Sequence, residues 1–199
     1  MNGTLVKNQL IFDFASGALG PAKSIFASTY LQLNSNASKT AGIFENILGQ
    51  NLFENVNIQP KHLKYVDCIN KENDKKNVIV NNPVTGFFGD LKELNWKQVY
   101  KGFKEYTASI DDKDELKLIK MDPGISVPLH SHDGKEYILV LEGSFCDEYG
   151  EYSKGDIQIN DQKIKHTPIA SRDRGCVCLS ITEKDVIFFG KYGSVLNLF

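Results

Sequence analysis

The histidines of this chain are concentrated where they could bind a metal ion. His130 and His132 lie one residue apart in the strand-like stretch GISVPLHSHDGKEYILVLEGSF (124–145), and Glu136 follows four positions later. Side chains alternate between the two faces of a strand, so both imidazoles point to one side. The Asp-Gly turn at 133–134 can bring Glu136 back beside them. Two imidazoles and a carboxylate are ligands that suit Zn, Fe, Mn, Ni or Cu.

A fourth ligand is expected from a later strand, and His166 is the histidine with suitable placement. The spacing G-x5-H-x-H-x3-E-x6-G, from Gly124 to Gly143, resembles the first sequence motif of cupins. Gly155, followed eleven positions later by His166, resembles the second motif. In that second motif Asp161 and Lys163 replace the usual proline and second glycine, so this loop is expected to differ in shape.

The cupin resemblance implies a β-barrel that holds one divalent metal ion. It assigns the ligands to His130, His132, Glu136 and His166. Zinc is the expected metal, with iron, manganese or nickel as alternatives.

Two cysteines are the second group of residues whose types and spacing could support chemistry. Cys176 and Cys178 alternate on a predicted strand and therefore share a face. They could be packed core residues, a redox-sensitive pair near the metal, or a source of one spare metal ligand. A disulfide between residues so close on one extended strand would be strained.

The second half of the chain has β character. The runs LKLIKM, EYILVLEGSF, DIQIN, CVCLSI and DVIFF recur at short intervals, separated by turns that contain glycine. Many short strands at even spacing are typical of an antiparallel barrel or a double-sheet jelly roll. We therefore predict a cupin double-stranded β-helix over residues 94–199.

The first part of the sequence, from residue 4 to about residue 50, predicts three short amphipathic helices. Gly20-Pro21 ends the first and begins the second, because proline suits the first turn of a helix. A polar break, NSNASKT, precedes the third helix at 40–55. Helices of this size seldom fold alone, so we expect them to pack on each other and on a partner surface. The prediction is an α+β chain with a helical domain (1–54), a polar linker (55–93) and the barrel (94–199).

Composition excludes several classes of function. The net charge of −2 gives no general reason to expect binding to nucleic acid or to an anionic membrane. No apolar run approaches the length of a membrane span, and the amino terminus lacks the layout of a secretory signal. We expect a cytoplasmic protein with reduced cysteines.

The sequence around the metal motifs resembles that of the ChrR-like anti-sigma factors. The similar segments are LEGSFCDEYGEYSKGD, HTPIASRDRGCVCL, LNWKQVYKGFKEYTAS and, more weakly, IFDFASGALGPAKSIFASTYLQL. The resemblance implies a regulator that binds an extracytoplasmic-function sigma factor through its helices and senses stress through a metal-binding cupin domain.

One family feature is missing. The family's helical domain usually binds zinc through an early histidine and a His-x-x-x-Cys-x-x-Cys group, whereas this chain has Tyr30, Asn34 and Ala37 at the matching positions. No histidine precedes His62, so the resemblance implies that this zinc site is absent.

Two classes of function remain open. The first is the sigma-factor regulator, or a relative in which the helices serve for homodimerisation. The second is a cupin metalloenzyme, such as an acetylacetone-cleaving dioxygenase, with a small-molecule ligand at the metal. No strong general acid or base stands beside the ligands in the sequence, which favours the regulator. Metal identity discriminates between them, because four ligands close a tetrahedral zinc site but leave open positions on an octahedral ion.

Overall fold

Helices occupy the first part of the chain and strands the second, as predicted. The structure, a computed structural model, describes residues 3–55, 83–108, 110 and 115–190. The helices are α1 Gly3–Ala15, α2 Pro21–Leu33, α3 Ser35–Asn55 and α4 Pro83–Phe88. The strands are β1 Lys97–Tyr100, β2 Phe103–Ala108, β3 Glu115–Met121, β4 His130–His132, β5 Glu136–Asp147, β6 Gly150–Ser153, β7 Ile157–Asn160, β8 Ile169–Ala170, β9 Cys176–Thr182 and β10 Val186–Phe188.

The helix boundaries follow local sequence signals. Pro21 opens α2, as the sequence predicts. The break before α3 is shorter than the predicted polar segment, because Asn34 alone separates the two helices. Its side-chain Oδ1 accepts the Ala37 N–H at 3.1 Å, which caps α3 and lets the helix begin at Ser35. In the described part of the chain, no helix is long and apolar enough to cross a membrane.

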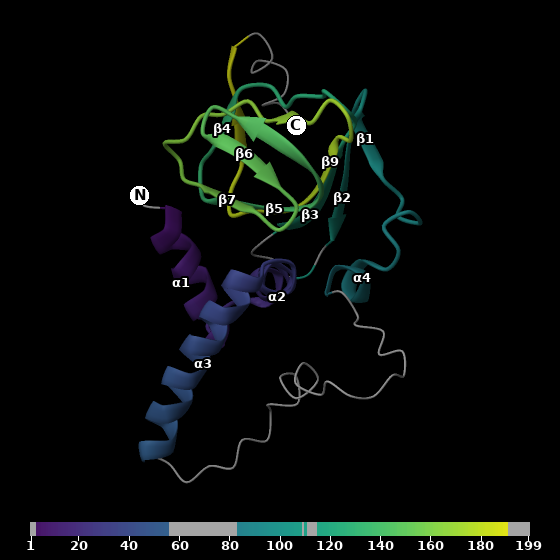
Figure 1. Cartoon of the computed structure of the whole chain (residues 1–199). Helices are drawn as coiled ribbons and strands as arrows, with labels where there is room; N and C mark the ends of the chain where they lie inside the picture. The colour runs from purple at the N-terminus through teal and green to yellow at the C-terminus, as the bar shows by residue number, and fades with distance from the viewer. Residues whose placement is uncertain (1–2, 56–82, 109, 111–114, 191–199) are drawn as a thin grey trace.

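The strands form an antiparallel cupin barrel, which confirms the predicted fold class. The strand order is β1–β2–β3–β9–β5–β6, and β7 and β8 also pair with β5. The short strand β4 pairs with β10. Figure 1 shows the four helices on one side of this barrel, with α3 extending away from it.

The central sheet has two buried faces. Its outer face carries Leu118, Leu139 and Leu179, which pack with Phe26 of α2 and Val84 of α4 in one apolar cluster. Its inner face carries a second cluster inside the barrel. The helices and barrel thus share a core. Helix α4 lies within the stretch predicted as a linker, whose residues 56–82 are outside the described residues.

Polar contacts fix α2 against the barrel. The Lys23 ammonium lies 2.8 Å from Glu183 Oε1, at the end of β9, and Phe26 packs edge-on against Tyr137. At the other end of α2, the Asn34 amide donates to the Gly155 carbonyl at 3.1 Å. Gly155 has a φ of +86°, and a Cβ there would lie 2.9 Å from the Leu33 carbonyl oxygen. This turn therefore favours glycine both for its backbone and for the close approach of α2.

Candidate metal centre

Backbone pairing brings the first histidine of the motif to the last. His130 and His166 exchange both backbone hydrogen bonds across antiparallel segments, at 3.1 and 3.0 Å. Residues paired in this way direct their side chains to the same face. His132 follows on that face of β4, which β10 holds in place through the Val186–His132 pair. A separation of 36 residues in sequence thereby becomes a direct contact.

Glu136 reaches the same point from the start of β5. The turn before it is held by the backbone bonds Asp133 N–H to Asp185 O and Glu183 N–H to Lys135 O, each 3.0 Å long. Across the sheet, Glu136 pairs with Asn160 of β7, whose amide donates to Glu136 Oε2 at 3.0 Å. The carboxylate is therefore oriented by a neighbour as well as by its turn.

The four predicted ligands form one buried cluster. Each offers a ligand atom, and these atoms all lie within 4.8 Å of one another. His130 Nε2 is 3.0 Å from His166 Nε2, and Glu136 Oε2 is 3.1 Å from His132 Nε2 and 3.4 Å from His166 Nε2. Donor atoms about 2.1 Å from one ion would be separated by about 3.0–3.4 Å in octahedral or tetrahedral geometry. None of the four residues is more than 5% exposed.

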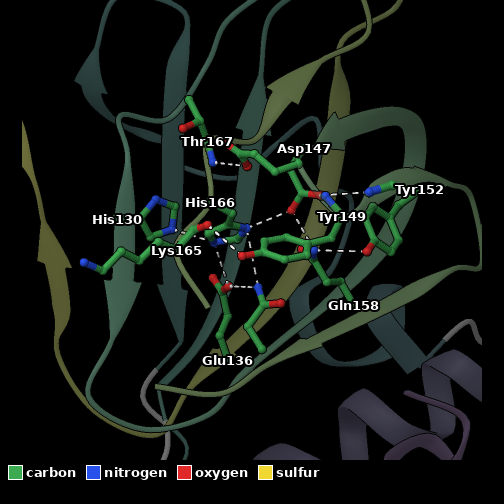
Figure 2. Close-up of polar contacts among 12 residues, drawn as sticks. His130, Glu136, Asp147, Tyr149, Tyr152, Gln158, Lys165, His166 and Thr167 are labelled. Carbon is green, nitrogen blue, oxygen red and sulfur yellow. Dashed lines mark hydrogen bonds and ion pairs between the residues drawn. The ribbon is translucent and has the colours of Figure 1, made fainter. Parts of the chain in front are cut away.

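Hydrogen bonds fix which nitrogen of two imidazoles faces the cluster. His130 Nδ1 donates to the Pro128 carbonyl at 2.9 Å, and His166 Nδ1 donates to Asp147 Oδ2 at 3.0 Å. The two Nε2 atoms then face each other (Figure 2). Two lone pairs at this distance repel unless a cation or a proton lies between them, so this arrangement fits a shared metal ion.

His132 gives a second test of fit. Both of its ring nitrogens are buried without a hydrogen-bond partner among the described residues. Its Nε2 lies close to Glu136 Oε2, yet the angles do not make a hydrogen bond. A buried nitrogen without a partner is costly, and a metal ion toward which Nε2 and the carboxylate both point would satisfy it. These residues therefore fit a divalent ion.

Charges in the metal-free cluster are unevenly distributed. Burial lowers the pKa of His130 to about 4, so this ring is neutral. Burial opposes protonation of His166, but the Asp147 and Glu136 carboxylates outweigh it and raise the pKa of His166 to about 9. Burial likewise opposes ionisation of Glu136, but the adjacent His132 and His166 rings outweigh it and lower the pKa of this carboxylate. At neutral pH, His166 therefore carries the proton that a metal ion would displace.

Metal affinity should consequently rise with pH. Below about pH 9 metal-free His166 holds a proton, whereas bound metal needs its Nε2 lone pair. His130 and Glu136 have already lost their protons at pH 6–8 and add little to this dependence. We expect about one proton released per Zn²⁺ bound and an affinity that rises about tenfold per pH unit from pH 6 to 8. Zinc titrations in weakly buffered solution, with released protons counted by back-titration, test this. An affinity independent of pH would contradict the proton assignment.

The cysteine pair lies inside the barrel. Cys176 and Cys178 are buried on the inner face of β9, in the cluster that also contains Ile138 and Val140. The hydrogen bond with Cys176 and burial raise the pKa of Cys178 well above its usual value. This environment favours packed thiols over a reactive thiolate, and a redox role stays a prediction. Tyr137, next to the inward-facing Glu136, faces α2 on the outer side of the sheet.

The altered second motif still closes its loop. The Asp161 carboxylate, where a proline is usual, accepts the Lys163 N–H at 2.9 Å, and the Ile164 N–H bonds to the Asp161 carbonyl at 3.0 Å. These bonds form an Asx-type turn that delivers His166 to the cluster.

Two residues around the centre were not predicted: Asp147 and Asn160. Asn160 shares a face with Gln158 on β7, and strand alternation could have indicated both as inward polar residues. Asp147 carried no comparable signal. Alternation from Glu136 along β5 would place it on the opposite face, but a register shift between Val140 and Glu142 turns it inward.

The chain was compared with known proteins. A family model described as ChrR Cupin-like domain matches residues 85–184. The anti-sigma-E factor ChrR of Cereibacter sphaeroides is 26% identical over 193 residues, which cover 92% of this chain and 91% of that protein. The crystal structure of Rhodobacter sphaeroides SigE in complex with the anti-sigma ChrR contains a similar chain, with a TM-score of 0.73 and 28% identity. That match covers 88% of this chain and 96% of the other. Both similarities extend beyond the barrel into the helices.

Proposed function

Because this chain belongs to the ChrR cupin-like family, we propose that it is an anti-sigma factor that holds an extracytoplasmic-function sigma factor away from RNA polymerase. The observation that carries this proposal is the extent of the similarity to ChrR, which covers 92% of the chain and therefore extends from the barrel into the helical part. A similarity to ChrR that was confined to the barrel would support the fold but not this function. We place the protein in the cytoplasm, where RNA polymerase acts.

The sigma-binding surface is assigned to α1 and α3. Leu5 and Phe12, two helical turns apart on α1, are 69% and 38% exposed, and Ile43 on α3 is 59% exposed. Phe12 contacts Phe44 of α3, which joins the two helices at this point. We call Leu5, Phe12 and Ile43 the α1/α3 apolar face. An exposed group of this kind marks a surface that a partner covers.

The partner that suits this face is an amphipathic helix of the sigma factor. Helix α2 is not available to a partner in the same way, because it packs on the barrel and its Ala22 and Phe26 are fully buried. The chain similar to this one in the SigE–ChrR crystal structure belongs to a complex with a sigma factor. An apolar helical stripe laid across α1 and α3 would bury side chains that the fold itself leaves exposed.

The described helices contain no metal-binding group of their own. In the described residues the only group of three or more His, Cys, Asp or Glu able to bind a metal is the cluster in the barrel. Tyr30 and Ala37 are buried in the apolar core instead. Asn34 caps α3 with its oxygen and binds the Gly155 carbonyl with its nitrogen. At a position where the family resemblance implies a zinc ligand, Asn34 thus links α3 to the barrel.

Asn34 variants separate these two roles. Asn34→Asp keeps the oxygen that caps α3 but loses the N–H donated to Gly155, whereas Asn34→Ala loses both. We expect the alanine variant to lose about 1–2 kcal/mol of stability and the aspartate variant less than half as much. Urea unfolding followed by circular dichroism measures the difference. Ser35→Ala, next to the cap, is the control; equal losses in both Asn34 variants would contradict the capping role.

We further propose that zinc occupies the barrel site and that its occupancy reaches the helices through Glu183. The Glu183 carboxylate accepts hydrogen bonds from Lys23 on α2 and from the Lys135 N–H in the turn between His132 and Glu136, at 2.8 and 3.2 Å. A change in that turn therefore acts on the contact that holds α2. This route gives a cupin sensor a physical connection to the proposed sigma-binding helices.

Co-purification tests the proposed function. The full-length chain is co-expressed with tagged extracytoplasmic-function sigma factors from the genome that encodes it, and complexes are measured by size-exclusion chromatography and light scattering. We expect a one-to-one complex with one of them and inhibition of transcription from its promoter in vitro. A homodimer that buries the α1/α3 apolar face, with no sigma factor bound, would overturn the proposal.

A further inference from the structure

Asp147 occupies an unusual position for an acidic residue at a hairpin. It is the last residue of β5, and its side chain is fully buried. Oδ1 accepts the backbone N–H groups of Tyr149 and Gly150, at 2.8 and 3.2 Å, in the turn that leads to β6. Oδ2 faces the barrel interior, where it meets Gln158 and His166. A buried carboxylate with this many N–H neighbours remains ionised and acts only as an acceptor.

We propose that Asp147 is the positioning residue of the metal centre, because it holds the proton of His166 on Nδ1 and leaves Nε2 for the metal ion. The distance from Oδ2 to Nδ1 is 3.0 Å, and an ionised carboxylate accepts only an N–H at that nitrogen. Nε2 is then directed toward His130 and Glu136 (Figure 2). The inference rests on the proposed metal site and is independent of sigma-factor binding.

Gln158 holds Asp147 in this orientation. Its amide nitrogen donates to Asp147 Oδ2 at 2.7 Å and to the Tyr152 hydroxyl oxygen at 3.1 Å. Rotating the amide would present its oxygen to the carboxylate, and this repulsion keeps the nitrogen in place. Asp147 is therefore restrained by the turn on one side and by Gln158 on the other.

The other ligands have weaker support. His130 donates to a neutral carbonyl, and Glu136 accepts from a neutral amide. Among the described residues, His132 has no hydrogen-bond partner. A charged acceptor on the far nitrogen of a histidine increases the basicity of the ligating nitrogen, and loss of such a partner typically lowers metal affinity by 10–100-fold. Asp147 is thus the neighbour with the largest expected influence on the metal.

Asp147→Asn tests the inference with minimal change of shape. Its oxygen must stay with the two turn N–H groups, so its NH₂ group faces His166 Nδ1 and Gln158. Two donors cannot share that contact, and the ring must move its proton to Nε2, where it opposes the metal. We expect Co²⁺ affinity to fall about 10–100-fold and the visible spectrum of bound Co²⁺ to change.

Glu148→Gln is the matched control. Glu148 is the exposed neighbour of Asp147 and accepts the N–H of Thr167, next to His166, at 2.9 Å. Its glutamine variant retains an acceptor oxygen, so Co²⁺ affinity and spectrum should equal those of the wild type. Wild-type affinity in Asp147→Asn, or an equal loss in Glu148→Gln, would overturn the inference.

A second measurement uses the wild-type chain and needs neither a bound metal ion nor a variant. ¹⁵N NMR of the histidine rings in the zinc-free wild-type chain, recorded at about pH 10 where His166 keeps a single ring proton, reports whether Nδ1 carries that proton. A protonated Nδ1 supports the inference, and a bare Nδ1 overturns it. If the wild type binds no Co²⁺, the metal proposal fails, and the NMR result still decides whether Asp147 holds the His166 proton on Nδ1.

Discussion

Replacing His166 with alanine should abolish stoichiometric metal binding. The change removes one of four ligands and the nitrogen that faces both His130 Nε2 and Glu136 Oε2. We expect the metal content of protein purified without added metal to fall from one ion to less than about 0.1 per chain, and zinc affinity to fall at least about 100-fold. Elemental analysis and competition with a chelator measure both quantities.

The same variant should also destabilise the metal-free fold. His166 carries the positive charge between Glu136 and Asp147, whose side chains are 6% and 0% exposed. Removing one member of a buried charged group typically costs about 3–5 kcal/mol, because the remaining charges stay buried without compensation. For a chain of this size that loss corresponds to a decrease in Tm on the order of 10 °C, measured by calorimetry in chelator.

Two further variants separate metal loss from charge loss. His130→Ala should lose the metal as completely, but the metal-free protein should be destabilised less, because His130 is neutral and donates only to the Pro128 carbonyl. His62→Ala removes the one histidine that is not a predicted ligand, and this variant should keep one metal ion. Retained metal in His166→Ala, or equal Tm values for the two ligand variants in chelator, would contradict this account.

The identity of the bound metal discriminates between regulator and enzyme. Zinc at one per chain agrees with a sensor site closed by four protein ligands. Iron or manganese at one per chain would favour the dioxygenase hypothesis, since an octahedral ion keeps positions for substrate or oxygen. The same elemental analysis of wild-type protein provides the answer.

The second large effect is expected at the α1/α3 apolar face. Ile43→Glu places a charge in the centre of the proposed interface, where burying it without a partner is costly. We expect affinity for the cognate sigma factor to fall at least about 100-fold, because central apolar residues carry most of the binding energy of an interface. Biolayer interferometry and inhibition of transcription in vitro measure the loss.

A matched change elsewhere controls for surface charge. Val99 on β1 is 44% exposed and lies on the barrel, so Val99→Glu should leave sigma-factor binding unchanged. Ile43→Glu should retain one metal ion per chain and the wild-type Tm, since Ile43 is outside the buried core. Wild-type binding by Ile43→Glu would place the interface on another surface.

Much of the candidate site was predictable because its geometry is local. The alternation of a strand puts His130 and His132 on one face, and the short turn before Glu136 returns the carboxylate to them. Pro21 likewise begins α2 as predicted, because the preference of proline for the first turn of a helix depends only on local backbone geometry. The same alternation could have assigned Tyr137, the neighbour of the inward Glu136, to the outer face of the sheet.

Other features depend on contacts that no local pattern encodes. Asp147 turns inward only because a bulge in β5 reverses the alternation, and bulges follow from strand pairing. The contacts of Asn34 with Gly155 and of Lys23 with Glu183 join residues 121 and 160 positions apart. They exist because the closed barrel offers α2 an apolar outer face to cover.

The sequence by itself therefore determined the four candidate ligands, the fold class and the family resemblance, because residue spacing along a strand and the turns that follow it specify them. The tertiary structure alone decided which carboxylate contacts His166 Nδ1, which contacts hold α2 against the barrel, and which helical residues stay exposed. Those outcomes depend on how barrel closure and helix docking bring distant segments together. Residue spacing along the chain does not specify such contacts.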